Sequence, residues 1–187
     1  MAFPVGAAGD RFKPGWQLTA GASWRFDERL ALQLDYGYGR HKAIGQSLQD
    51  GFVNGRHVLQ HLDLDLRLTV NPGGQALFYL LAGPSIVRRE ANVSDVAGYA
   101  PGPAVCDPWL MVCEPAGAPL RDIAGSRSET GLGLNAGAGI EIPLAGEARF
   151  FVESRCLLAR GREYGLPSGP ARGSGAVYLP LTLGLRF

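Results

Sequence analysis

The sequence predicts an all-β fold: an eight-stranded up-and-down antiparallel transmembrane β-barrel in which seven strands are visible and strand 1 is largely missing. Two observations lead to this prediction. Apolar and polar residues alternate along most of the 187-residue chain, and the side chains of an extended strand point alternately to two faces. The connections between these segments are alternately short and long, as they are when strands cross a membrane and return.

Seven segments carry the two-residue period, in chain order 16–26, 30–40, 57–70, 77–88, 130–143, 148–160 and 177–187. Segment 57–70 shows the period most clearly, because leucine or valine opposes histidine, aspartate, arginine or threonine. Segment 177–187 has a continuous apolar face over about 11 residues, the length of a tilted membrane-spanning strand. Segment 77–88 is apolar on both faces, so its facing stays open.

The six connections between these segments alternate in length. They are short at 27–29, 71–76 and 144–147, and long at loop 2 (41–56), loop 3 (89–129) and loop 4 (161–175). The same alternation assigns 5–15 to a long loop 1 and leaves only Met1–Pro4 for the strand before it. We therefore expect a single domain over 1–187 that lacks most of strand 1 and the signal peptide ahead of it.

The composition of the two faces indicates which one points outward. The polar faces carry glycine, serine, threonine, glutamine and asparagine rather than the mixed Lys and Glu of a soluble surface. A lipocalin-type soluble barrel, with its apolar face inward, is the alternative. A lipid-facing apolar surface leaves the polar face as a narrow interior, where buried charges must pair. We predict an interior charge network made of Arg25, Asp35, Asp63, Asp65, Arg67, Glu141, Glu153, Arg155 and Arg186.

Aromatic residues and cysteines add two further expectations. Aromatic side chains near the strand ends suit the girdles of a membrane barrel, at Trp16, Trp24, Phe26, Tyr38, Phe150 and Phe187. Cys106 and Cys113 flank a Pro-rich segment, and a local disulfide is favoured over a zinc half-site because no second Cys or His pair stands at ligand spacing. Cys156 is expected to face lipid as a small apolar residue.

The chain resembles the small bacterial outer-membrane β-barrel proteins, the OmpA/OmpX-like or porin-family barrels. The resemblance rests on Gly15-Trp16, on the alternating glycines of 131–141 with Asn135 and Glu141, on 149–155, and on 179–187. It implies an integral protein of the bacterial outer membrane, with outer-membrane lipid and the barrel assembly machinery as partners. It also implies that the terminal Phe187 is the signal that this machinery reads.

The net charge and the motifs of the chain exclude some classes of function. The net charge of +1 and the absence of a Lys/Arg run exclude a nucleic-acid partner. We expect no cofactor, no metal and a monomer with a structural, adhesive or surface-interaction role, whose extracellular ligand the sequence does not identify. Loop 3, with Trp109, Leu110 and Met111, is the expected recognition segment, because loops on a rigid scaffold carry function.

Two other functions stay open. A narrow ion or small-solute channel would use Glu153 and Arg155 as selectivity residues, although eight strands leave an interior filled by side chains. A lipid-directed enzyme would use His61 with Asp63 and Asp65, which share one face of a strand. The sequence places no serine beside His61 as a nucleophile, so we expect structural pairing there and no enzymatic activity.

Overall fold

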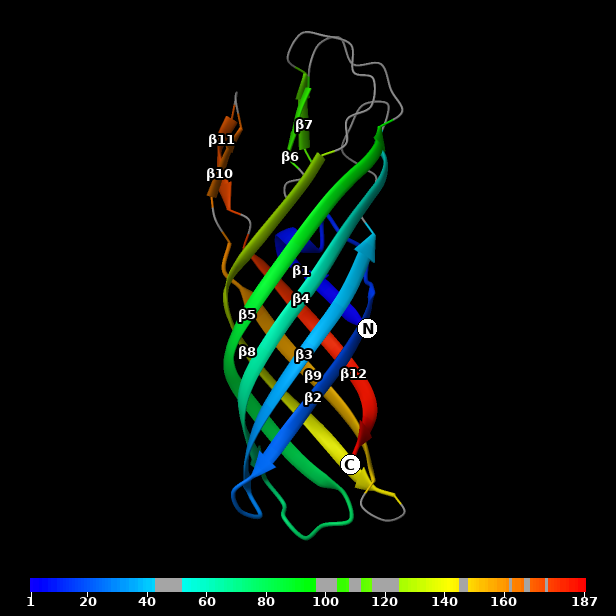
Figure 1. The fold of residues 1–187 in the computed structure, drawn as a ribbon, viewed down its shortest axis with the longest axis vertical. Coiled ribbons are helices and arrows are strands. Elements are labelled where there is room, and N and C mark those ends of the chain that lie inside the picture. Colours follow the sequence, from blue (N-terminus) through cyan, green and yellow to red (C-terminus); the bar gives the residue numbers. More distant parts are fainter. Residues whose placement is uncertain are drawn as a thin grey trace.

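A computed structural model describes residues 1–42, 52–96, 104–107, 112–115, 125–144, 148–161, 163–166, 169–173 and 175–187. Its main body is one antiparallel sheet of eight strands in the order β1-β12-β9-β8-β5-β4-β3-β2. The sheet curls into a barrel that is incomplete between its two edge strands (Figure 1). The predicted all-β, up-and-down barrel is therefore confirmed.

The eight strands of this sheet are β1 (Ala2–Val5), β2 (Trp16–Arg25), β3 (Leu30–Lys42), β4 (Phe52–Thr69), β5 (Leu77–Val96), β8 (Gly125–Pro143), β9 (Arg149–Ala159) and β12 (Ala176–Arg186). Two small hairpins lie outside it, β6 (Ala104–Asp107) with β7 (Val112–Pro115), and β10 (Glu163–Leu166) with β11 (Gly169–Gly173). A short 3-10 helix, η1 (Gly6–Ala8), follows β1. Within the described residues, no helix is long and apolar enough to cross a membrane.

Three adjacent strands are longer than the sequence predicts. β4, β5 and β8 have 18, 20 and 19 residues, whereas about 9–11 suffice to cross a bilayer. Both ends of the segment predicted as loop 3 (89–129) therefore belong to strands. β5 and β8 still pair there, from Arg89↔Glu129 to Val93↔Gly125. Around Arg89 and Glu129 both faces of the strands carry polar residues, so the alternation of apolar and polar residues ends earlier than the hydrogen-bonded ladder does.

The apolar face of the sheet points outward, as predicted. Leucines at alternate positions of β4 and β8, such as Leu66 and Leu132, are exposed, while Asp63, Asp65 and Glu141 on the opposite face are fully buried. On β5, Phe78, Leu80 and Ile86 are exposed and Tyr79, Leu81 and Val87 are buried, which settles the facing of 77–88.

The outward apolar band ends at one level on neighbouring strands. Gln60, Arg88 and Thr130 are the first polar residues beyond it, and they pair directly as Gln60↔Arg88 and Arg88↔Thr130. On β8 the band runs from Leu132 to Ile142, a distance of about 33 Å along the strand at ~3.3 Å per residue. A tilt of about 45° reduces this to roughly 23 Å, close to the ~25 Å apolar belt of outer-membrane barrels.

The turns at the other end of the barrel, away from the long strand extensions, are short. Hydrogen bonds between side chains and the backbone stabilise them. In the β2–β3 turn, the backbone N–H groups of Leu30 and Arg29 donate to Asp27 Oδ1 at 2.6 and 2.7 Å. These bonds favour the carboxylate and lower the pKa of Asp27 below its usual value. In the β4–β5 turn, Asn71 bonds the backbone of Ala76 and Phe78, and Gly73 takes a φ of +85° that favours glycine.

Candidate functional site

The polar side chains of three strands converge in the middle of the barrel. Asp35 lies on β3, Asp63 and Asp65 lie on β4, and Glu153 and Arg155 lie on β9, all at inward positions of the two-residue period. Asp35 and Asp63 are direct register partners. β9 is separated from β4 by β8 and β5 in the sheet, so Arg155 reaches across the lumen to meet these carboxylates.

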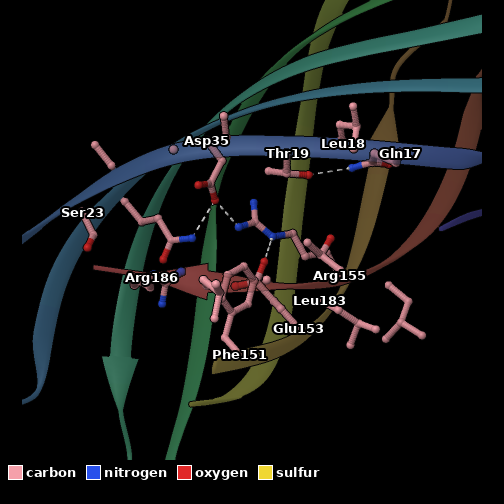
Figure 2. A pocket seen from close by; sticks show the side chains of 18 of the residues that line it. Gln17, Leu18, Thr19, Ser23, Asp35, Phe151, Glu153, Arg155, Leu183 and Arg186 are labelled. Carbon is pink, nitrogen blue, oxygen red and sulfur yellow. Dashed lines mark hydrogen bonds and ion pairs between the residues drawn. The ribbon is translucent and has the colours of Figure 1, made fainter. Parts of the chain in front are cut away.

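Arg155 is the centre of this cluster and contacts four carboxylates. Its Nη1 donates to Asp63 at 3.0 Å and to Asp65 at 2.9 Å. Its Nε donates to Glu153 at 2.5 Å, and its Nη2 donates to Asp35 (Figure 2). One guanidinium therefore serves carboxylates from three strands, and the cluster carries more acidic than basic groups.

Uncharged side chains supply the remaining hydrogen bonds of the carboxylates. Gln33 Nε2 donates to Asp35 at 2.6 Å, and Asn135 Nδ2 donates to Asp65 at 2.8 Å. His61 Nδ1 lies 2.8 Å from Asp63, and its other ring nitrogen lies 3.0 Å from the Gln17 amide. His61 thus contacts a carboxylate and an amide rather than a serine or cysteine, an arrangement suited to structural pairing.

A second cluster lies nearer the short turns, and its charge has the opposite sign. Glu141 accepts hydrogen bonds from Arg186 and pairs with Arg67 at 2.7 Å and Arg149 at 3.6 Å. Tyr79 connects the two clusters. Its hydroxyl donates to Glu153 at 2.8 Å, and the Arg67 guanidinium lies 3.9 Å from its ring centroid. The predicted interior charges thus form two clusters of opposite net charge along the barrel axis.

Glycines on the inward face make room for these large side chains. A Cβ added at Gly21 would lie 1.9 Å from Asp35 Oδ1, and one at Gly37 would lie 2.1 Å from His61 Nε2. A Cβ at Gly139 would lie 2.3 Å from the Tyr79 ring and hydroxyl. The glycine content of the polar faces is therefore a packing requirement of the network.

A third layer closes the interior toward the long-strand end. Phe12 is buried and stacks on His57 with a centroid separation of 4.5 Å. His57 Nε2 lies 2.8 Å from the Tyr178 hydroxyl, and Arg89 pairs with Glu129 at 3.0 Å. The segment predicted as loop 1 thus contributes a plug residue to the lumen, which the sequence pattern did not reveal because a single aromatic carries no period.

Arg25 departs from the predicted network. Its side chain is exposed at the end of β2, where β2 is an edge of the sheet. Because no strand of the sheet follows β2 on its outer side, the side chain of Arg25 meets solvent rather than the packed interior. Conversely, the sequence analysis missed Gln33, Tyr79 and Asn135. Gln33 lies two residues from Asp35, and Asn135 lies six residues from Glu141, on the same strands, and this even spacing was the available signal. Tyr79 had no such signal, because its strand, β5, carries no predicted network residue.

The remaining predicted site residues are the terminal Phe187, the three cysteines and the recognition segment of loop 3. Phe187 ends the chain beyond β12 and is 90% exposed. Cys156 is half-buried with a free thiol, and Cys106 and Cys113 are register partners in the β6–β7 hairpin. Trp109, Leu110 and Met111 lie outside the described residues. In the part of the chain that the structure describes, no group of three or more His, Cys, Asp or Glu side chains could hold a metal ion.

A cleft of about 800 Å³ opens beside the Arg155 cluster, in the wall between β2 and β12. Figure 2 shows Gln17, Thr19 and Ser23 of β2 on one side of it, and Leu183 and Arg186 of β12 on the other. Asp35, Glu153 and Arg155 form its floor.

A known protein family matches most of the chain. Residues 2–157 match the family described as outer membrane protein beta-barrel domain. No curated protein matches the chain.

Proposed function

Because the chain belongs to the outer membrane protein beta-barrel domain family, we propose that it is a plugged membrane scaffold whose extended strands serve surface interaction. The observation that carries this proposal is the overshoot of β4, β5 and β8 beyond the level of Gln60, Arg88 and Thr130. On β5, the eight residues that follow Arg88, up to Val96, correspond to about 27 Å of strand outside the apolar band.

The overshooting strands form a polar surface whose side chains bond one another within β5 and between β5 and β8. Asn92 Nδ2 donates to Glu90 at 2.8 Å, and Ser126 Oγ donates to Asn92 at 2.6 Å. The β6–β7 hairpin lies at the same end of the barrel (Figure 1). A paired polar sheet beyond the apolar band is a scaffold suited to recognition of a partner outside the cell.

The test of this role is replacement of residues 97–124 by a short Gly-Ser linker, with β5 and β8 left intact. Cells that display the unmodified protein should adhere to a surface or to one another more strongly than cells with the replacement. Replacement of 162–174 by the same linker is the matched control for the removal of an outer segment. Equal adhesion of all three strains, at equal surface display, would contradict the proposal.

The plugged interior predicts that the folded protein does not conduct ions. Arg155 bridges the lumen, and Phe12 stacks on His57 beside Tyr178 in the next layer, which supports an interior filled by side chains, as expected for eight strands. Purified protein in planar bilayers should give no unitary conductance steps. Steps of constant size that change when Glu153 is replaced by glutamine would favour a channel instead.

The β6–β7 register supports the disulfide between Cys106 and Cys113. The two residues are directly opposite in an antiparallel pair, where Cα atoms are about 4.5–5.5 Å apart, within the disulfide range of about 4.4–6.8 Å. Denatured, unreduced protein should label at one thiol, Cys156, and at all three cysteines after reduction. The Cys113→Ser variant should label at two thiols without reduction. Three reactive thiols in the unreduced parent protein would exclude the bond.

The chemistry of the chain end supports a role of Phe187 in assembly. Phe187 is exposed and directly follows β12, so its aromatic ring is available to the machinery that inserts outer-membrane barrels. We further propose that the protein is not an enzyme, because His61 is engaged by Asp63 and Gln17. A His61→Ala strain should leave the lipid A profile of the cell unchanged.

A further inference from the structure

The outward face of β3 and β4 carries a group of cations directly beyond the apolar band. Arg40 and Lys42 take outward positions on β3, with the buried His41 between them on the inward face, and Arg56 takes an outward position on β4. Lys42 and Arg56 are exposed, and Arg40 is half-buried. Figure 1 shows β3 and β4 side by side, with these ends toward the long strand extensions.

Two of these cations are direct neighbours across the ladder. Lys42 and Arg56 are register partners in the β3–β4 pair, so their Cβ atoms lie about 4.5–5.5 Å apart on the same face. Like charges at directly opposite positions destabilise a sheet. An anion bound between the two side chains would turn this repulsion into two attractive contacts.

Both lysines of the chain lie at this place. Lys13 and Lys42 are the only lysines among the 18 basic residues of the sequence. The backbone N–H of Lys13 donates to the carbonyl oxygen of Lys42 at 2.8 Å, and the side chain of Lys13 is exposed. The segment between β1 and β2 thus adds a fourth cation. We call Lys13, Arg40, Lys42 and Arg56 the rim patch.

The rim patch has no carboxylate partner among the described residues. The interior arginines differ, since Arg67 and Arg155 each contact a carboxylate. On the outward face of β5, the nearest acidic residue by register is Glu90, which is opposite Val58 rather than a cation. Its Oε1 already accepts a hydrogen bond from Asn92 at 2.8 Å. The positive charge of the patch is therefore available to a ligand.

The position of the rim patch favours a lipid headgroup as that ligand. Arg40 is the register partner of Trp16 and stands two residues beyond Tyr38 on the same face of β3. The Trp16 and Tyr38 rings lie 5.7 Å apart between centroids, and Trp16 is exposed. Such aromatic residues mark the boundary of the hydrocarbon in membrane barrels. Cations that follow directly on the lipid-facing side reach the layer of lipid phosphates.

We propose that the rim patch is a binding site for a membrane lipid whose headgroup carries phosphate monoesters, with one phosphate held between Lys42 and Arg56. A phosphate monoester has a charge of about −1.5 to −2 at neutral pH, which matches a group of cations better than the single charge of a phosphodiester. Arginine binds phosphate through two N–H groups, and lysine binds it as a point charge. The site does not depend on the recognition role proposed for the strand extensions.

The test measures lipid retained by the folded protein in zwitterionic micelles, by native mass spectrometry during titration with diphosphorylated lipid A. Lys42→Gln combined with Arg56→Gln should weaken binding by about tenfold or more, because both charge-assisted contacts to the phosphate are lost. The matched control is Arg25→Gln combined with Arg29→Gln, which removes two exposed arginines at the opposite end of the barrel. The control should bind the lipid like the parent protein.

Stability gives a second readout that a loss of folding cannot imitate. In vesicles of phosphatidylcholine alone, the Lys42–Arg56 double variant should unfold at the same urea concentration as the parent protein or at a higher one, because the cross-strand repulsion is removed. In vesicles that also contain diphosphorylated lipid A, the parent protein should be the more stable of the two. The same order of stability in both kinds of vesicle would overturn the proposal.

The headgroup arms identify the ligand. Phosphatidylglycerol, a phosphodiester, and lipid A with both phosphates removed should each bind several-fold more weakly than diphosphorylated lipid A. Equal binding of these three lipids would contradict a phosphate-monoester site. Displacement of the lipid by an equal concentration of inorganic phosphate would make the patch a site for the free ion, which also overturns the proposal.

Discussion

Arg155→Met should prevent the protein from reaching its folded barrel state. The substitution keeps much of the volume of the side chain but removes the guanidinium that contacts Asp35, Asp63, Asp65 and Glu153. Loss of one partner of a buried ion pair costs about 3–5 kcal/mol, and here four carboxylates lose their shared cation. We expect the compact, fast-migrating band of unboiled protein in SDS gels to disappear.

The matched control is Arg160→Met, which removes an exposed arginine just after the same strand, β9. It should fold like the parent protein. A partial rescue separates charge from packing: Asp63→Asn and Asp65→Asn added to Arg155→Met remove two of the stranded charges and should restore part of the folded band. If Arg155→Met folded as stably as Arg160→Met, the charge cluster would have no structural role.

Gly139→Val should destabilise the barrel strongly by displacing Tyr79. The added Cβ alone would lie 2.3 Å from the Tyr79 ring and hydroxyl, and Tyr79 is almost fully buried between Glu153 and Arg67. Overpacking of a filled interior costs about 1–3 kcal/mol, and loss of the Tyr79 hydrogen bond to Glu153 adds about 1 kcal/mol. Urea unfolding in lipid vesicles, followed by tryptophan fluorescence, measures the change.

Ala138→Val is the control for this prediction, because Ala138 is the adjacent residue of β8 and faces outward. The two methyl groups added there should meet lipid and change the free energy of unfolding by less than about 0.5 kcal/mol. Tyr79→Phe combined with Gly139→Val should not recover the loss, since the clash involves the ring as well as the hydroxyl. Equal stability of the two valine variants would show that the interior beside Tyr79 is not filled.

Most of the fold could be predicted from the sequence because the decisive signal is local. The two-residue period of 57–70 and 130–143 is a property of neighbouring residues, and it indicates both the strand and its two faces. Strand ends could not be predicted in the same way. Around Arg89 and Glu129, both faces are polar, so β5 and β8 continue as a paired ladder without any alternation to mark it.

The site was only partly predictable, for a related reason. A charge such as Asp63 could be assigned to the inward face by its position in the period. Its partner could not be assigned, because pairing across the lumen depends on how far each strand is displaced along its neighbours. Arg155 and Glu141 are both inward, yet one gathers carboxylates and the other gathers arginines. Phe12 is a buried residue of a segment without any periodic pattern.

The sequence by itself determined that this chain is an outer-membrane-type β-barrel with an apolar outer face. The alternation of apolar and polar residues and the lengths of the connections follow directly from the order of residues along the chain. Tertiary structure alone decided three things. It segregated the interior charge into two clusters, placed the Phe12 plug, and left a cleft between β2 and β12. Each depends on contacts between residues far apart in the chain, and their geometry follows from strand register and curvature rather than from any local pattern.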